Sequence, residues 1–208
     1  MRTITLNLLL LLLISSSPIF MGCTYSGAIR TDISPTAMVG RKFPAKVGIY
    51  FAPRLEQYEE STNPATYYGS AHTFTFKMGP AIKEALTKSV GTAYSNVSVL
   101  SEPPKPGQFD RDISFDLQSS NVQIEFVPKF WTSAAKANAI IHVTMEIMDG
   151  SSLKAIQRLT VSGNGFTTQD TSGGGDAQKQ FSRAIEDAIR QLAENTANLL
   201  ISGVAEPK

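Results

Sequence analysis

The sequence predicts a single domain of the α+β class, in which an antiparallel-leaning sheet carries two helices packed on one face. Three observations lead to this prediction. Several segments alternate apolar and polar residues with a period of two, which is typical of half-buried strands. Two other segments repeat apolar residues at helical spacing. Most of the strand patterns follow one another along the chain, and the longest helical pattern comes last.

Length and composition fit one folded domain. The chain has 208 residues, of which 42% are hydrophobic, enough to bury a sizeable core. It carries 19 Lys and Arg against 18 Asp and Glu, and this balance argues against nucleic acid binding, which needs a basic face to neutralise phosphates. With one Cys and two His, the chain lacks the inventory for a disulfide framework or a Cys- and His-rich metal centre, and no motif indicates a cofactor.

Residues 1–22 have the composition of a secretory signal. Arg2 is the only charge, Leu8 to Ile14 form an unbroken apolar run, and Ser15 to Pro18 interrupt it. The alternative is an uncleaved membrane anchor, because residues 4–22 are almost long enough to span a bilayer. The serine-proline interruption argues against that alternative.

The segment ends in Gly22-Cys23, which resembles the lipobox of bacterial lipoproteins, where Leu and a small residue precede Gly or Ala and then Cys. Phe20 and Met21 depart from that pattern. The resemblance implies that Cys23 becomes the first mature residue and carries the lipid, whose acyl chains contribute about 0.8 kcal/mol per buried CH₂ to membrane binding. Thr24, in place of the Asp that retains lipoproteins in the inner membrane, implies a position in the bacterial outer membrane, facing the periplasm.

Residues 24–44 combine Ser, Thr, Gly and Pro with few apolar residues and no periodicity. Two interpretations stay open for them. The segment can be a flexible tether, which over about twenty residues would span roughly 25 Å. Part of it can instead pack along the domain as an irregular strand. The globular domain then occupies residues 45–208.

In the first half of that domain the patterns predict strands around one helix. Pro53 ends the first strand, and Gly79-Pro80 opens the helix, since Pro is tolerated in a first turn where its missing N–H has no intrahelical partner. A Pro- and Gly-containing stretch after the last of these strands predicts an exposed loop. The strands are expected at residues 45–52, 71–77 and 96–101, the helix at 81–94 and the loop at 102–112.

The second half predicts four extended segments followed by a long amphipathic helix. Asp149-Gly150 is a turn signal, so the last two strands are expected to form a hairpin. A glycine-rich hinge leads into the helix, with Asp176 available as its N-cap, and Gly203 is expected to end it. The strands are expected at residues 113–117, 122–130, 139–148 and 153–168, the hinge at 171–176 and the helix at 177–201.

An aromatic and acidic stretch at residues 54–70 is the main candidate for a contact surface. Pro64 and Gly69 exclude a regular element through it. Tyrosines there can offer rigid amphipathic contact area to a protein partner or a glycan, and a lone Trp at a strand end is a second candidate. The alternatives are a solvated loop and an aromatic plug at the edge of the core. The candidate contact residues are Tyr58, Tyr67, Tyr68 and Trp131.

The sequence shows no catalytic motif. His72 and His142 are the only imidazoles, and no Gly-x-Ser-x-Gly segment is present. Residues 173–175 are glycines but lack the Lys-Ser/Thr ending of a phosphate-binding loop. Three closely spaced aspartates lack the glycine that a calcium loop requires. They are Asp110, Asp112 and Asp116.

The sequence therefore predicts a lipid-anchored, non-enzymatic accessory or assembly component of an outer-membrane or periplasmic complex. The order of its elements resembles small outer-membrane accessory lipoproteins, the YajG-type proteins and the lipopolysaccharide-assembly lipoprotein, which open with a signal, a Gly-Cys such as Gly22-Cys23 and a first strand. The alternative is a module that holds a glycan or lipid between sheet and helices under the tyrosine-rich loop. A hydrolase would require a Ser and an acidic residue around His72 or His142.

Overall fold

A computed structural model describes residues 23–36, 42–66, 71–129, 133–171 and 174–204. The expected signal at residues 1–22 lies outside them. The strands are β1 (Thr24–Ala28), β2 (Phe43–Phe51), β3 (Glu59–Thr62), β4 (Thr73–Lys77), β5 (Tyr94–Leu100), β6 (Arg111–Pro128), β7 (Ser133–Asp149) and β8 (Ala155–Thr171). The helices are α2 (Pro53–Glu56), α3 (Gly79–Ala93) and α4 (Gly174–Leu199), and a π-helical turn, η1 (Leu200–Val204), continues α4.

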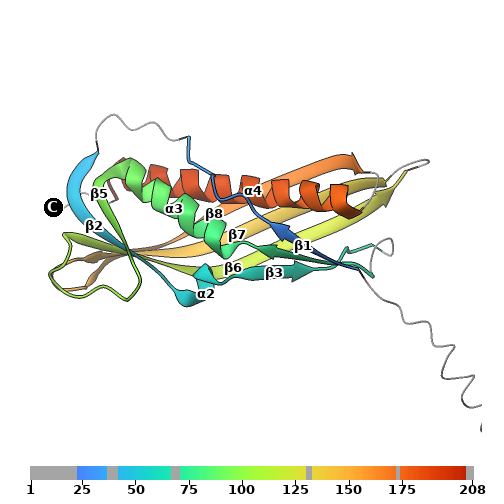
Figure 1. Ribbon diagram of the computed structural model, residues 1–208. Coiled ribbons are helices and arrows are strands. Elements are labelled where there is room, and N and C mark those ends of the chain that lie inside the picture. The colour runs from blue at the N-terminus through green and yellow to red at the C-terminus, as the bar shows by residue number, and fades with distance from the viewer. Residues whose placement is uncertain (1–22, 37–41, 67–70, 130–132, 172–173, 205–208) are drawn as a thin grey trace, which may run out of the picture.

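The strands form two sheets, and the predicted α+β class is confirmed (Figure 1). The larger sheet has the order β5-β2-β6-β7-β8, and the smaller one has the order β1-β4-β3. β6, β7 and β8 are antiparallel, whereas β2 runs parallel to both β5 and β6. The larger sheet is therefore mixed rather than purely antiparallel. β2 and β5 can pair in parallel because the chain between them includes α3, which carries it back along the sheet.

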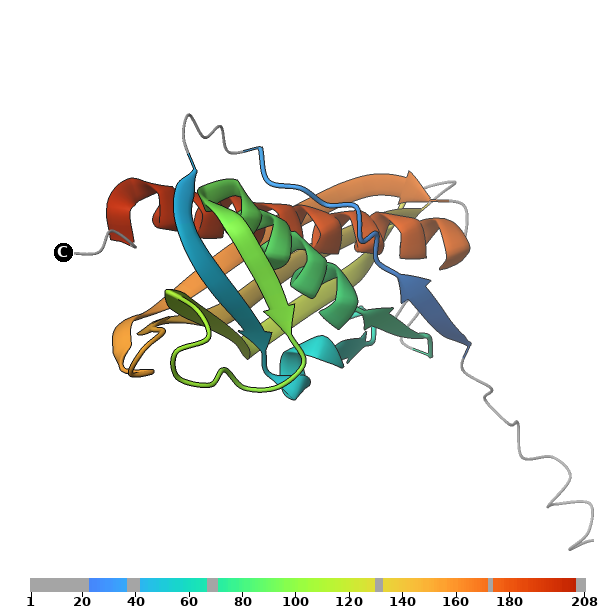
Figure 2. The same ribbon diagram turned by 60° about the vertical axis from the view of Figure 1, so that its left-hand side comes forward.

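Both long helices lie on the same face of the larger sheet, as the two ribbon views show (Figures 1 and 2). The predicted apolar stripe of α4 is buried at Phe181, Ile185 and Ile189, which are 0% exposed. β7 presents alternate residues such as Val143 and Met145 to the same core. This agreement follows from local periodicity, because each element can bury only the face that is apolar. Residue Asp176 lies inside the first turn of α4 rather than at its N-cap, and Gly203 lies within η1.

The two segments expected at residues 113–117 and 122–130 form one strand of 18 residues, β6. Its pairing with β7 shifts between Leu117 and Ser119, which marks a β-bulge. A bulge adds one residue and therefore moves the following side chains to the opposite face. Leu117 and Val122 are both buried in the core, although in a strand of regular alternation they would point to opposite faces. The sequence pattern breaks at the bulge for this reason.

The segment after Cys23 packs against the domain. β1 pairs in parallel with β4, and the Tyr25 ring stacks on Phe74 with centroids 5.1 Å apart. Ile29 and Ile33 farther along are each 6% exposed. Residues 24–36 therefore adopt the packed alternative, and the flexible tether does not apply to them. Residues 37–41 lie outside the described part of the chain.

Residues 53–62 contain two short regular elements where the sequence predicted none. Pro53 begins α2, and β3 pairs antiparallel with β4. Four-residue elements are too short to show a period in the sequence, so only their tertiary contacts identify them. Leu55 of α2 is fully buried, which attaches this segment to the core.

Candidate functional site

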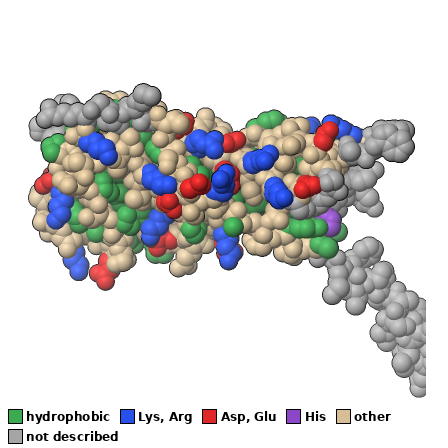
Figure 3. Space-filling view, turned by 45° about the horizontal axis from the view of Figure 1, so that its top comes forward, with side chains coloured by type: hydrophobic (Ala, Val, Ile, Leu, Met, Phe, Trp, Pro, Cys, Tyr) green, Lys and Arg blue, Asp and Glu red, His purple; other side chains and the backbone are tan. Residues whose placement is uncertain are grey.

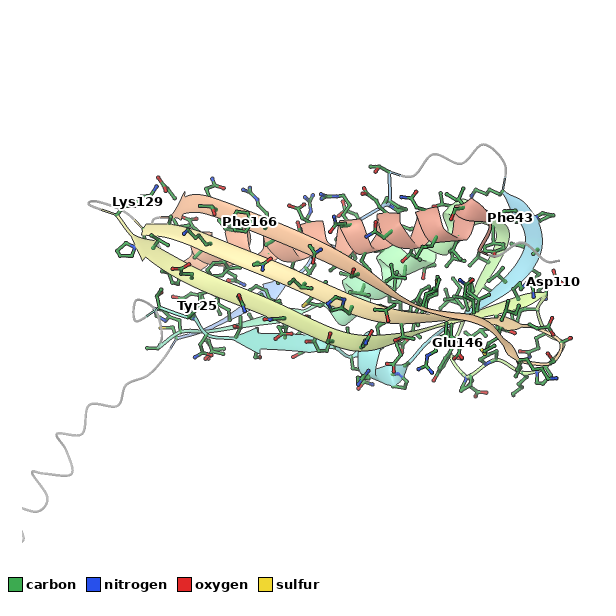
Figure 4. All side chains as sticks on the ribbon, turned by 180° about the vertical axis from the view of Figure 1, so that it is seen from behind. Tyr25, Phe43, Asp110, Lys129, Glu146 and Phe166 are labelled. Carbon is green, nitrogen blue, oxygen red and sulfur yellow. The ribbon has the colours of Figure 1, made fainter. Side chains whose placement is uncertain are left out.

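Cys23 is exposed and directly precedes β1. Its carbonyl oxygen accepts a hydrogen bond from the backbone N–H of Thr73, at 3.1 Å, at the beginning of β4. The predicted lipidation site is thus accessible and held at one end of the sheets, beside Tyr25 (Figure 4). None of the helices in the described part of the chain has both the length and the apolar character that crossing a membrane requires.

Tyr58 is held in place by hydrogen bonds of its backbone and of its hydroxyl group. Its backbone oxygen accepts hydrogen bonds from the N–H groups of Met78 and Gly79, both at 3.0 Å, at the start of α3. Its half-buried hydroxyl donates to the Glu60 carboxylate. Burial, reinforced by that neighbouring carboxylate, raises the pKa of Tyr58 to about 12. These contacts hold α2, β3 and α3 together. The other contact candidates, Tyr67, Tyr68 and Trp131, lie outside the described residues.

The two histidines lie at different sheets, since His72 directly precedes β4 and His142 belongs to β7. The His72 ring lies edge-on to Tyr25 with centroids 5.5 Å apart, and its buried Nδ1 has no hydrogen-bond partner in the described part of the chain. His142 lies in β7 between Ser119 and Ser162 in the strand register. Among the described residues, no hydrogen bond joins either imidazole to a serine or an acid. The same residues contain no cluster of three His, Cys, Asp or Glu side chains that could hold a metal ion.

The three closely spaced aspartates have separate environments and do not face a common site. The Oδ2 of Asp110 accepts a hydrogen bond from the Lys46 backbone N–H at 2.7 Å. Asp116 forms an exposed ion pair with Arg54 at 3.3 Å. Asp112 is 1% exposed, and neither of its carboxylate oxygens has a hydrogen-bond partner among the described residues. The spacing in sequence therefore does not produce a calcium site.

Asp112 is buried beside Gly48, its register partner in β2. A Cβ atom at Gly48 would lie 2.5 Å from Oδ1 of Asp112 and 2.7 Å from the Phe109 ring. Phe109 belongs to the predicted exposed loop, so this loop folds back over the carboxyl group. Burial raises the pKa of Asp112, because the charged form loses its hydration.

The structure contains an open pocket of about 450 Å³ at the end of the sheet opposite Cys23. In Figure 4, Phe43 and Asp110 mark this end, while Tyr25 and Lys129 mark the other. Strand register builds the pocket, because β2 and β5 place Phe43 beside Tyr94, and β6 and β7 place Arg111 beside Asp149. The lining residues are Phe43, Pro44, Ala45, Tyr94, Asp110, Arg111 and Asp149.

Asp149 is the most firmly held polar group of the pocket. Its Oδ1 accepts hydrogen bonds from the backbone N–H and the hydroxyl of both Ser151 and Ser152, at 2.5 to 3.2 Å. Those bonds, from the Ser151 and Ser152 hydroxyls first, lower the pKa of Asp149 to about 2. The carboxylate is therefore charged at neutral pH, with its Oδ2 turned toward Arg111 at 3.7 Å.

Arg111 and Tyr94 present polar groups without hydrogen-bond partners. The Arg111 side chain is 15% exposed and donates no hydrogen bond to a described residue. Tyr94 is 2% exposed, and its hydroxyl has no partner among the described residues. Burial raises the pKa of this hydroxyl, and the nearby positive charge of Arg111 opposes the rise. Buried polar groups are normally paired, so the Tyr94 hydroxyl marks this pocket as a candidate binding site.

The sequence patterns did not indicate this pocket. Phe43 and Pro44 fell within the expected tether, and Asp110 and Arg111 within an exposed loop. The pocket arises only where the ends of strands from distant parts of the chain meet. No local spacing of residue types records such a meeting.

The charged surface shows no single-sign patch on the face in Figure 3, where Lys and Arg are interspersed with Asp and Glu. Several charged residues pair along a helix, including Lys88 with Glu84 at 2.9 Å and Arg190 with Asp187 at 2.6 Å. Exposed pairs of this kind contribute little to stability, about 0–1 kcal/mol each.

No protein-family model matches the sequence, and no curated protein matches it. Solved structures do resemble the fold. A protein of the DUF330 family from Xanthomonas campestris matches at 11% identity and a TM-score of 0.49, over 86% of this chain and 94% of its own. A minor lipoprotein from Acinetobacter baumannii matches at 7% identity and 0.42, over 80% and 100%. A candidate lipoprotein from Caulobacter crescentus matches at 12% and 0.39, over 62% and 86%. At these scores the likenesses carry no inference about function.

Proposed function

We propose that this protein is a lipid-anchored, non-enzymatic lipoprotein of the bacterial envelope, serving as an accessory or assembly component of an outer-membrane or periplasmic complex. The observation that carries the proposal is the placement of Cys23. This cysteine follows a secretory-type segment and a Gly22 in the sequence, and it is exposed at the boundary of the folded domain. An acyl chain attached to Cys23 can therefore enter a bilayer without disturbing the core.

The packing of β1 gives this anchor a defined geometry. Because β1 begins at Thr24, no spacer separates the lipidated residue from the domain. The Cys23 end is then held at the membrane surface. β7 alone, with 17 residues at about 3.3 Å each, spans roughly 55 Å toward the opposite end. In this arrangement the pocket end of the sheet projects away from the bilayer, into the periplasm.

The anchor is tested by Cys23→Ser in the full chain, followed by membrane fractionation and mass spectrometry of the N-terminus. We expect the variant to lose the lipid and either remain unprocessed or leave the membrane. Thr24→Ser is the matched control, because it changes the next residue and keeps the thiol. Unchanged membrane attachment together with unchanged processing of Cys23→Ser would rule out the anchor.

The accessory role is tested by cross-linking in intact cells and purification of the detergent-extracted full chain. We expect a defined envelope protein to copurify with the wild type and to be lost when Cys23→Ser releases the domain. Recovery of the wild type alone, as a monomer, would argue against a role in a complex.

A second candidate function is ligand binding, and the pocket of about 450 Å³ favours it. The location differs from the expected one between sheet and helices. There, side chains such as Phe181, Ile189 and Met145 fill the space and are 0% exposed. A ligand would bind instead at the strand ends, beside Tyr94 at the C-terminal end of α3, whereas Tyr58 of the expected tyrosine-rich loop lies at the start of that helix.

A further inference from the structure

The pocket at the strand ends offers hydrogen-bond donors and acceptors side by side. Arg111 supplies a guanidinium group that is ion-paired with Asp149 at 3.7 Å and donates no hydrogen bond to a described residue, and the buried Tyr94 hydroxyl has no partner among the described residues. Asp149 has its Oδ1 occupied by serines, so its Oδ2 remains available as an acceptor. Asp110 uses Oδ2 for the Lys46 N–H and leaves its Oδ1 available. A ligand that both donates and accepts would satisfy all four side chains.

The charges of the pocket disfavour an ionic ligand. An anion drawn to Arg111 would also face the carboxylates of Asp110 and Asp149. Asp149 stays ionised at neutral pH, because the serine hydrogen bonds lower its pKa to about 2. A cation would meet the guanidinium, which already lies 3.7 Å from Asp149. Hydroxyl groups avoid both repulsions, since each can donate to a carboxylate and accept from a guanidinium or a phenol.

Part of the pocket lining is apolar. The rings of Phe43 and Tyr94 lie 5.7 Å apart at an angle of 45°, and Pro44 and Ala45 continue the surface. Such a surface can cover the C–H face of a sugar ring while the polar side chains bind its hydroxyl rim. The volume of about 450 Å³ falls within the range of about 300–1,000 Å³ that is usual for small-molecule sites.

We propose that this pocket binds an uncharged saccharide of one or two rings, with Arg111, Asp149 and Tyr94 on its hydroxyl groups and Phe43 against its apolar face. The proposal specifies the ligand-binding candidate function and is independent of the lipid anchor. With Cys23 at the membrane, the site would face the periplasm. The saccharide can be a free sugar or the end of a longer glycan.

The test is ligand-observed saturation-transfer NMR on the full chain in detergent. The probes are glucose, N-acetylglucosamine, maltose, chitobiose, maltohexaose and chitohexaose, with inorganic phosphate, acetate and methylammonium as ionic probes. We expect at least one saccharide to bind and the ionic probes not to bind. Tighter binding of a hexasaccharide than of its disaccharide would assign the ligand to a glycan end, and equal binding to a free sugar.

Two variants connect binding to the pocket. Tyr94→Phe removes the unpartnered hydroxyl and is expected to weaken the binding of the saccharide by about 3- to 10-fold. The melting temperature should not fall, because that hydroxyl donates to no described residue in the free protein. Arg111→Met is expected to weaken it by more than about 10-fold. Tyr58→Phe is the matched control, because it removes a tyrosine hydroxyl far from the pocket, and it should bind as the wild type does.

Three results would overturn the proposal. The first is an absence of binding of every saccharide to the wild type. The second is equal affinity of the wild type and Tyr94→Phe for the saccharide that binds. The third is binding of phosphate or acetate that Arg111→Met abolishes, which would identify an anion site. Each of these can occur while Cys23→Ser still releases the domain from the membrane, so failure of the saccharide site and failure of the anchor are distinguishable.

Discussion

Gly163 of β8 lies directly against Ala188 of α4, so that a Cβ atom at Gly163 would be 2.0 Å from the Ala188 carbonyl oxygen. Gly165, two residues farther along the same face, stands in the same relation to Ala184 at 1.9 Å. These two glycines let the backbone of the helix approach the edge of the sheet. The clash partner is backbone in both cases, so a side chain there cannot be accommodated by a rotamer change.

We therefore expect Gly163→Ala to displace α4 from β8. Overpacking of this kind costs about 2–3 kcal/mol, which for a chain of this size lowers the melting temperature by about 5–10 °C. Differential scanning calorimetry measures the change. The matched control is Gly91→Ala in α3, where no atom lies within 4 Å of the added Cβ. It should stabilise by about 0.5–1 kcal/mol, because Ala loses less backbone entropy than Gly in a helix. Equal melting temperatures of the two variants would contradict the packing.

The edge strand β8 is capped by two amide side chains of α4. Asn195 donates from Nδ2 to the Ser162 carbonyl at 2.8 Å, and the Asn164 N–H donates to Oε1 of Gln191 at 2.6 Å. Removing either amide should lower the free energy of unfolding by about 0.5–1 kcal/mol and leave edge groups open to pairing with another chain. Urea denaturation of Asn195→Ala and Gln191→Ala checks this. Asn198→Ala, an exposed amide three residues on, should be silent, and a loss of similar size there would remove the explanation.

Asp112 is expected to make the protein less stable as the pH rises. The pKa of Asp112 in the folded state lies above its pKa in the unfolded chain. The free energy that Asp112 contributes to stability is therefore fully present below the unfolded-state pKa, and it is lost as the pH rises through the folded-state pKa. Asp112→Asn should therefore unfold at a higher temperature than the wild type at pH 7, and the difference should vanish near pH 3. Asp116→Asn on the same strand, an exposed carboxylate, should change stability by at most about 1 kcal/mol. A variant at Asp112 that is less stable than the wild type at pH 7 would refute the buried, unpartnered carboxylate.

Asp149 is expected to show the opposite dependence. Its folded-state pKa of about 2 lies below the ordinary value of 3.8, so the stability it contributes is present above pH 3.8 and is lost as the pH falls through 2. Asp149→Asn should destabilise the protein at pH 7 and have a much smaller effect near pH 2. Thermal unfolding across this range measures the difference. If Asp149→Asn and the wild type differed in stability by the same amount at every pH, the contribution of Asp149 would not depend on the charge of its carboxylate.

Residues 24–36 are expected to exchange their backbone hydrogens slowly. β1 is bonded to β4, and Ile29 and Ile33 are buried, so the segment opens only when it detaches from the domain. Hydrogen exchange followed by mass spectrometry should show it protected relative to the exposed loop at residues 101–109. Ile33→Ser should speed its exchange, because it removes a buried contact. Exchange as fast as in the loop would restore the flexible tether.

The sequence by itself determined the elements that have a complete local pattern. α3 and α4 repeat apolar residues at helical spacing, and β4 and β7 alternate with a period of two, so their buried faces follow from neighbouring residues alone. The position of Cys23 beside Gly22 is likewise written in the sequence.

Only the tertiary structure decided the features that depend on distant partners. β1 is a strand because it pairs with β4 and because its Tyr25 ring stacks on Phe74, while its own residues carry no period. The bulge after Leu117 cancels the alternation that would have shown β6 as one strand. The pocket joins Phe43, Tyr94 and Arg111 from three strands whose register is set by the whole sheet. Contacts between residues far apart in the chain supply the free energy in each case, and a local pattern does not encode them.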